Sequence, residues 1–298
     1  MELVDSFKSL CDRPLLPRPT GVAPRLTSLP DVRAVLFDVY GTLVVSASGD
    51  LGVAQETSEE HALRQALEAS ELAGDLEKAS RRGARLLLER IEATHDELRH
   101  RAVAHPEVDI REVWAVVLAT LRAEELVLGD ASPQQIDRLA VEYECRVNPV
   151  WPMPCLEETL GKLRQRGLRL GIVSNAQFYT PLLFGAFLDQ SLSDLGFDDE
   201  LCEWSYVRRQ AKPSTGLYER VAEELDRRHG VSPRQTLFVG NDMLNDIWAA
   251  AEVGFQTALF AADQRSLRLR REDPRCADLE PDVVLTDLAQ VVGCVSTP

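Results

Sequence analysis

The sequence predicts an α/β fold in which a doubly wound, Rossmann-like parallel sheet carries a separate α-helical cap. After Pro154, short apolar runs alternate with helical patterns, which is typical of a parallel sheet covered by helices on both faces. One more apolar run, Val32–Phe37, lies far upstream. Between these parts, residues 50–148 show helical periodicity without a convincing strand. We therefore predict a helical insertion within the sheet domain.

These patterns divide the chain into three parts. Residues 1–31 contain five prolines and only a short amphipathic start. We expect an irregular arm there, packed on the surface or forming a disordered lead-in. The core is expected to comprise residues 32–49 and 149–298, and the cap residues 50–148.

The cap is predicted to consist of several amphipathic helices. Apolar residues recur at spacings of three and four in 84–91 and in 113–121. Ser132 begins a further helix, because a proline follows at the first helical position and Gln135 closes a capping box. Asn148-Pro149 ends that helix.

The core is predicted to continue with a helix around Cys155–Arg166, which ends at Gly167. Further strands, with helices between them, are expected at Leu168–Val173, Cys202–Val207, Thr236–Val239, Gln256–Phe260 and Asp282–Leu285.

Composition excludes several classes of partner. The chain has 33 Lys+Arg against 48 Asp+Glu, a net charge of −15, which repels nucleic acid and anionic membrane surfaces. A small anionic substrate needs only a local positive pocket. No apolar run approaches the roughly 18 residues that span a bilayer, and the N-terminal residues do not resemble a signal peptide. Six scattered cysteines without a Cys-x-x-Cys pair predict reduced thiols in a cytoplasmic protein.

Polar side chains follow the predicted strands, where the carboxyl ends of parallel strands form ligand sites. These segments are Asp38-Val39-Tyr40-Gly41-Thr42, Ser174-Asn175, Lys212-Pro213, and Gly240-Asn241-Asp242 with Asp246 four residues later. Carboxylates suit Mg²⁺, whereas hydroxyl and ammonium groups suit a phosphoryl group. A carboxylate at such a place can also act as a nucleophile.

In this order, the four segments resemble the motifs of the haloacid dehalogenase-like hydrolase superfamily. The resemblance covers roughly residues 32–290, and the helical insertion is similar to the mobile cap of that family. It implies that Asp38 is the nucleophile, that Thr42 and Ser174 hydrogen-bond the transferring group, and that Lys212 neutralises charge. It also implies an Mg²⁺ site and a set of substrate-binding residues. The implied metal ligands are Asp38, the backbone carbonyl of Tyr40 and Asp242, and Asp246 would hold a metal-bound water at this metal site or orient Lys212. The implied substrate-binding residues are Gly41, Asn175 and Tyr218.

Tyr40 departs from the phosphatases of this superfamily, which carry an aspartate there as general acid and base. A phenol with a pKa near 10 serves poorly as a base at neutral pH. Asp-x-Tyr-Gly-Thr resembles the 2-haloacid dehalogenases instead, but residues 44–60 contain no arginine like the one with which those enzymes bind substrate. Asp242 and Asp246 favour a retained cation site. We therefore expect an Mg²⁺-dependent phosphatase for a small phosphorylated metabolite, with a dehalogenase as the first alternative.

Two further interpretations remain open at this point. The sheet and cap could form a binding module that has lost catalysis, with Asp38 or Asp246 acting only as caps of a turn or helix. The basic cluster Arg265, Arg268, Arg270 and Arg271 could form an anion-binding edge, although a solvated surface is the interpretation we favour.

Overall fold

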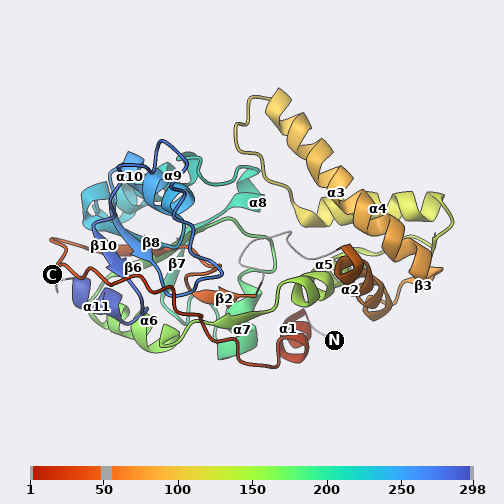
Figure 1. Cartoon of the computed structure of the whole chain (residues 1–298), viewed down its shortest axis with the longest axis horizontal. Helices are drawn as coiled ribbons and strands as arrows, with labels where there is room; N and C mark the ends of the chain where they lie inside the picture. Colours follow the sequence, from red (N-terminus) through yellow and green to blue (C-terminus); the bar gives the residue numbers. More distant parts are fainter. Residues whose placement is uncertain (1–2, 48–55, 296–298) are drawn as a thin grey trace.

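A six-stranded parallel sheet lies at the centre of the structure, a computed structural model that describes residues 3–47 and 56–295. The strand order is β10-β9-β8-β1-β6-β7, and the sheet lies in the left half of Figure 1. The chain adds two strands on one side of β1 and then returns to add three on the other side. The order therefore reverses between β1 and β8, and a doubly wound sheet binds ligands at such a point. The strands are β1 (Ala34–Phe37), β6 (Arg169–Ser174), β7 (Phe197–Trp204), β8 (Thr236–Gly240), β9 (Gln256–Phe260) and β10 (Val283–Leu285).

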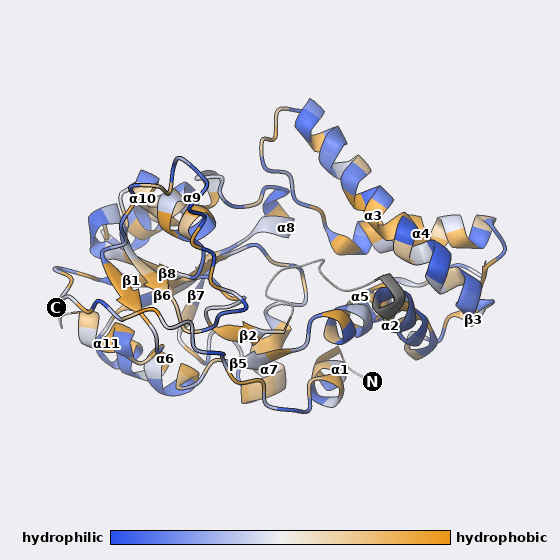
Figure 2. Cartoon of the chain, in the orientation of Figure 1, coloured by the Kyte–Doolittle hydropathy of each residue, from blue (hydrophilic) through white to orange (hydrophobic). Residues whose placement is uncertain are grey.

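Both faces of the sheet are covered by helices, as the buried strands require. In β1, Ala34 and Leu36 pack toward α9 and α10, whereas Val35 and Phe37 belong to the core on the opposite face. Figure 2 shows the central strands in hydrophobic colours. The helices of this part are α6 (Leu156–Gln165), α7 (Leu182–Leu188), α8 (Ser205–Arg208), η1 (Pro233–Gln235), α9 (Gly216–His229), η2 (Met243–Trp248), α10 (Ala249–Val253) and α11 (Gln290–Cys294).

The helices between residues 56 and 147 gather on one side of the molecule, away from the sheet (Figure 1). The chain leaves the core through β2 (Val44–Ser46) and returns through β5 (Val150–Pro152), and these two strands pair antiparallel. The predicted capping box between Ser132 and Gln135 is confirmed. The helices and short strands of this part are α2 (Glu56–Ala69), β3 (Ala73–Gly74), α3 (Leu76–His100), α4 (Ile110–Ala123), β4 (Val127–Leu128) and α5 (Pro133–Val147).

A second connection joins the helical part to the core, just before α4. Gln177 accepts a hydrogen bond from the Ile110 amide at 2.9 Å and donates one to the Val108 carbonyl at 2.9 Å. Ser205 donates to Glu107 at 2.9 Å. The helical part is therefore held at this contact as well as at the β2–β5 pair.

Three local expectations need correction. The N-terminal arm begins with a helix, α1 (Leu3–Leu10), whose Phe7 is buried and which packs against α5 and α7. The strand expected at Cys202–Val207 is β7, which begins earlier and ends at Trp204, since the next residues form α8. Three consecutive acidic residues at the sheet edge hide its start from an apolar pattern. The two-residue pair β3–β4 interrupts the helical part and is too short to predict.

No described helix has the length and apolar character needed to cross a membrane. All six cysteines are free thiols, as expected.

Candidate active site

Asp38 lies at the carboxyl end of the central strand β1, because it directly follows that strand. Its amide still donates to the Val239 carbonyl at 3.0 Å, as a continuation of the sheet. The chain then turns sharply, and the amides of Thr42, Leu43 and Val44 all donate to the Val39 carbonyl. Gly41 makes this turn possible with a φ of +83°, a conformation that side chains disfavour.

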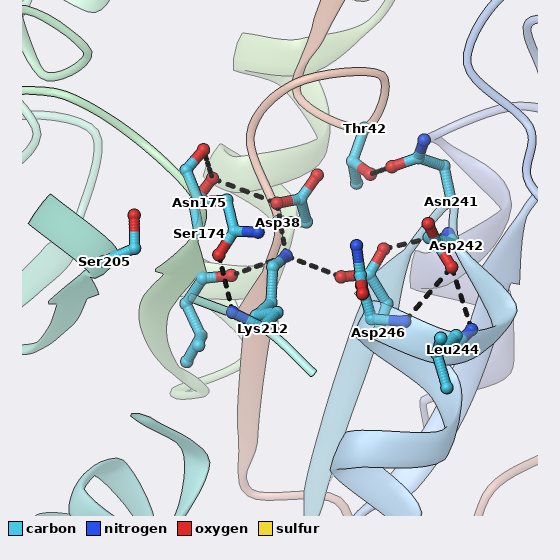
Figure 3. A network of polar contacts seen from close by, with 12 residues as sticks. Asp38, Thr42, Ser174, Asn175, Ser205, Lys212, Asn241, Asp242, Leu244 and Asp246 are labelled. Atoms are coloured by element: carbon cyan, nitrogen blue, oxygen red, sulfur yellow. Dashed lines mark hydrogen bonds and ion pairs between the residues drawn. The ribbon is translucent and has the colours of Figure 1, made fainter. Parts of the chain in front are cut away.

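Lys212 links two carboxylates in the centre of the site. Its Nζ lies 2.6 Å from Asp38 Oδ1 and 2.6 Å from Asp246 Oδ1 (Figure 3). All three side chains are buried, with exposed fractions of 3%, 8% and 1% for Lys212, Asp38 and Asp246. A Cβ on Gly240 would lie 2.4 Å from the Asp246 carboxyl carbon, so glycine is needed for this close approach.

Burial and charge oppose one another in this cluster. The pKa of Asp246 is raised to about 7. Burial is the largest cause, the nearby Asp38 and Asp242 carboxylates act in the same direction, and the Lys212 ammonium opposes them. Burial alone would lower the pKa of Lys212, but the carboxylates of Asp246 and Asp38 outweigh it, so this pKa lies above its usual value. Lys212 is therefore a permanent ammonium next to Asp38.

Polar partners orient Asp38 and Lys212. Ser174 Oγ donates to Asp38 Oδ1 at 3.0 Å. Asn175 Oδ1 accepts a hydrogen bond from the Lys212 amide at 2.8 Å. Among the residues of the described ranges, Asp38 Oδ2 receives no hydrogen bond. The two carboxylate oxygens of Asp38 therefore differ, because Ser174 and Lys212 both donate to Oδ1.

The side chains of Asn241 and Asp242, which follow β8, have different hydrogen-bond partners. Asn241 Oδ1 accepts a hydrogen bond from Thr42 at 3.2 Å, beside the turn that carries Asp38 (Figure 3). Asp242 instead caps η2, because its Oδ1 accepts the amides of Leu244 and Asn245 at 2.8 and 3.1 Å. Asp242 thus takes the helix-capping role that the sequence left open for Asp246.

Arg270 forms an ion pair with Asp242 that the sequence did not indicate. The Arg270 guanidinium donates to Asp242 Oδ2 at 2.6 and 3.1 Å and to Oδ1 at 3.2 Å. The Asp242 side chain is only 8% exposed. Arg270 is itself exposed, as expected for a solvated surface, but its guanidinium is also paired with the buried Asp242 carboxylate.

These residues surround a pocket of about 170 Å³, roughly the volume of six water molecules. Of the expected residues, Asp38, Tyr40, Asn175, Lys212, Asp242 and Asp246 line it. Sequence reasoning assigned no site role to several other lining residues, most of which lie outside the four quoted segments. The additional lining residues are Ser46, Asn148, Asn241, Asn245, Ser266 and Arg268.

The two tyrosines of the prediction have different surroundings. Tyr218 is fully buried, donates to the Asn245 carbonyl at 2.6 Å and packs against Phe238 and Phe255. It is therefore a core residue and does not line the pocket, contrary to the expected substrate-binding role. Tyr40 lines the pocket, and its hydroxyl lies 3.0 Å from Thr180 Oγ1. Burial raises the pKa of Tyr40 above its ordinary value, so the phenol stays neutral.

Among the described residues, no group of three or more His, Cys, Asp or Glu side chains is arranged to hold a metal ion, so a divalent cation would need water and backbone oxygen as further ligands. Asp38 Oδ2 is a hard oxygen without a hydrogen-bond donor in the described part of the chain, and Mg²⁺ in proteins is commonly held by one or two carboxylates with water. Asp38 and the Tyr40 carbonyl would hold the cation, joined by Asp242 only after Arg270 has left its carboxylate. A cation at this place would therefore compete with the Arg270 guanidinium.

We expect Gly41→Ala to destabilise the fold by about 2 kcal/mol or more, because it combines left-handed strain with overpacking. An added Cβ would lie 2.5 Å from Ser266 Cβ and 2.8 Å from Asn241 Nδ2. Thermal unfolding checks this prediction. Gly161→Ala is the matched control, because a Cβ there meets nothing within 4 Å. Equal melting temperatures for the two variants would contradict the crowding described here.

Comparisons with known proteins agree on one family. The family model described as haloacid dehalogenase-like hydrolase matches residues 32–254. Phosphoglycolate phosphatase of Shigella boydii is 31% identical over 235 residues, covering 75% of this chain and 79% of that protein. Ribulose-1,5-bisphosphate 5-phosphatase of Halopiger xanaduensis is 27% identical and covers 59% of this chain and 70% of that protein.

A solved structure supports the fold. The 2-haloacid dehalogenase of Pseudomonas syringae pv. Tomato DC3000 superposes with a TM-score of 0.58, covering 88% of this chain and 97% of that one, at 19% identity. From the family match and the phosphatase relatives, the chain belongs to the haloacid dehalogenase-like hydrolases and is a hydrolytic enzyme.

Proposed function

We propose that this hydrolase is an Mg²⁺-assisted phosphatase that acts on a small phosphorylated metabolite through a covalent adduct on Asp38. The observation that carries the proposal is the arrangement of Asp38 in the pocket. One of its oxygens is held by Lys212 at 2.6 Å and Ser174 at 3.0 Å, and the other has no hydrogen-bond donor among the described residues. The phosphatases among the relatives supply the reaction class. The pocket of about 170 Å³ favours a small substrate.

In the first step, Asp38 Oδ2 attacks the phosphorus atom of the bound ester. A bond forms between this oxygen and phosphorus while the bond to the ester oxygen breaks, which leaves an aspartyl phosphate. Lys212 holds Asp38 in position and offsets the negative charge that develops around phosphorus. The leaving oxygen takes its proton from solvent, because the buried phenol of Tyr40 is a weak acid.

In the second step, water attacks phosphorus and the bond to Asp38 breaks. The products are inorganic phosphate and the free Asp38 carboxylate, and the proton from water passes to phosphate or solvent. Mg²⁺, when bound, would neutralise phosphoryl oxygens and help to orient the ester. Thr42 and Asn241, which hydrogen-bond each other at 3.2 Å, keep the turn after Asp38 in place.

Dehalogenation is the second candidate, because the surroundings of Tyr40 favour it. In this reaction Asp38 would displace halide from carbon to give an ester, which water then cleaves. A halide ion leaves without a proton, so this reaction needs no general acid at position 40. A neutral Tyr40 hydrogen-bonded to Thr180 would therefore not slow it. The same nucleophile would serve both reactions.

One experiment separates the candidates. Phosphate release from p-nitrophenyl phosphate and 2-phosphoglycolate is measured with Mg²⁺ and with EDTA, beside chloride release from 2-chloropropionate. The phosphatase proposal expects Mg²⁺-dependent phosphate release and no chloride. Chloride release that EDTA leaves unchanged, without phosphate release, would overturn it in favour of dehalogenation. Failure of all three substrates would favour a module that has lost catalysis.

We expect Arg270→Gln to tighten Mg²⁺ binding about tenfold, which corresponds to about 1.4 kcal/mol. The reason is that the variant removes the guanidinium that holds Asp242 at 2.6 Å. Calorimetric titration checks the affinity, and the rise in melting temperature with Mg²⁺ gives a second readout. Arg271→Gln is the control, because it removes the same charge from a neighbouring exposed side chain. Equal Mg²⁺ affinity in both variants would show that Arg270 does not compete with the cation.

A further inference from the structure

A second pocket, here called the basic pocket, lies at the end of the sheet opposite to Asp38. It has a volume of about 280 Å³, and its described lining residues are Arg33, Gly167, Arg169, Arg228, His229 and Val231. Arg33 directly precedes β1, whereas Asp38 directly follows it. The basic pocket is therefore separate from the pocket around Asp38, and the proposed reaction does not use it.

Two strands and one helix bring the basic side chains together. The Arg169 amide donates to the Arg33 carbonyl at 3.0 Å, so these two residues lie beside each other where β6 and β1 begin. Leu168 and Leu170 belong to the core on the other face of the sheet, and the alternation of a strand therefore directs Arg169 toward α9. The Arg33 guanidinium donates to the carbonyl of Gly230, which caps the end of α9, at 3.0 Å.

The last turn of α9 adds two more basic side chains, Arg228 and His229. Both are held by Asp198 of β7, which lies 3.6 Å from Arg228 Nη1 and 3.3 Å from His229 Nε2, and Glu200 lies 4.0 Å from Arg228. None of the described residues that line the basic pocket is acidic, although the chain has a net charge of −15. The pocket therefore concentrates positive charge in an acidic protein.

Arg33 and Arg169 have hydrogen-bond donors without protein partners. A guanidinium carries five N–H donors. Within the described ranges, the Arg33 guanidinium makes one hydrogen bond, to a neutral carbonyl, and the Arg169 guanidinium makes none. Neither forms an ion pair with a described carboxylate. Because neighbouring like charges repel one another, an anion between the two guanidiniums would be stabilised there.

We propose that the basic pocket binds a diphosphate group, with Arg33 and Arg169 each presenting a guanidinium to one of the two phosphates. Pairs of arginine and phosphate are frequently bidentate, because the planar fork of the guanidinium matches two phosphate oxygens. The volume of about 280 Å³ is roughly that of nine water molecules, which leaves room for two linked phosphates. The site does not depend on the reaction at Asp38.

Calorimetric titration with pyrophosphate, in EDTA so that no divalent cation binds the ligand, tests this site. We expect the native protein to bind pyrophosphate at least about tenfold more tightly than Arg169→Gln does, because the variant loses one charged fork. Arg227→Gln is the matched control, since Arg227 is an exposed residue of α9 with the same charge that does not line the pocket. At physiological salt its affinity should stay within about twofold of the native value. Orthophosphate should bind the native protein at least about fivefold more weakly than pyrophosphate, because it engages one fork.

ADP distinguishes two sources of the diphosphate group. Binding of ADP as tight as that of pyrophosphate would support a nucleotide as the ligand, whereas binding of pyrophosphate without ADP would support the free anion. Either result requires that Arg169→Gln weakens the binding.

Equal pyrophosphate affinity in the native protein and Arg169→Gln would overturn the proposal, as would equal losses in Arg169→Gln and Arg227→Gln, which would reflect net charge alone. Equal binding of orthophosphate and pyrophosphate by the native protein would overturn the assignment of a diphosphate. Melting temperatures without ligand show that each variant is folded. Phosphate ester turnover by Arg169→Gln should equal that of the native protein. Because the titrations need no turnover, failure of the proposed function would leave their result intact.

Discussion

Asp38→Asn is expected to lower kcat for phosphate ester hydrolysis by at least about 10³-fold, as the loss of a covalent nucleophile typically does. The amide keeps the size of the side chain but is a far weaker nucleophile than the carboxylate. Lys212 would keep Asp246 as a partner at 2.6 Å, so the variant should fold. Initial rates with p-nitrophenyl phosphate give the direct measurement. Asp38→Ala should give the same loss and cannot regain a carboxylate by amide hydrolysis.

Beryllofluoride gives a second readout that does not depend on turnover. It mimics a phosphoryl group on a carboxylate, so with Mg²⁺ it should raise the melting temperature of the native protein. The Asp38→Asn variant should show no such rise. Asp199→Asn, an exposed aspartate in β7, should behave like the native protein in both assays. Near-native turnover by Asp38→Asn would contradict the covalent mechanism.

Local patterns were sufficient to predict the sheet and the charged residues around Asp38. The apolar runs that end at Asp38, at Ser174 and before Asn241 are strands β1, β6 and β8. Because the carboxyl ends of parallel strands lie at the same side of a sheet, the pattern also predicted that Asp38, Lys212 and Asp246 meet. In the structure, Lys212 Nζ lies 2.6 Å from Asp38 Oδ1 and 2.6 Å from Asp246 Oδ1. The capping box at Ser132 was predictable for the same reason, since its partners lie three residues apart.

The errors concern contacts between residues far apart in the sequence. Arg270 reaches Asp242 across 28 positions, and Ser266 packs against Gly41 across a still longer separation. No periodicity in the sequence indicates such contacts, so we predicted only a solvated surface for the basic segment that contains Arg270. Tyr218 matched a motif position, but its hydroxyl is used by the Asn245 carbonyl within the core. A motif gives the residue type, whereas packing decides which way the side chain points.

Tyr40→Asp is expected to speed hydrolysis of an alkyl phosphate, because general acid–base assistance is typically worth about 10²–10⁴-fold. In the native protein the phenol is neutral, bound to Thr180 at 3.0 Å, and burial keeps its pKa above the ordinary value. Alkyl esters, whose leaving oxygen needs a proton, should therefore turn over far more slowly than aryl esters. A new carboxyl near Asp38 and Glu144 would have a raised pKa, since like charges favour the protonated form. Such a group could donate a proton near neutral pH.

The ratio of alkyl to aryl phosphate turnover is the decisive measurement, because it separates acid catalysis from packing. Tyr40 also packs against the hydrophobic core, so a smaller side chain loosens the pocket. Lost packing should slow both esters alike, whereas a restored acid should accelerate mainly the alkyl ester. Tyr40→Phe is the matched control: it removes the hydroxyl and keeps the ring, and the ratio should stay at its native value. If Tyr40→Asp also leaves the ratio unchanged, position 40 is not a vacant acid–base position. That result would count against the phosphatase mechanism and favour the dehalogenase alternative.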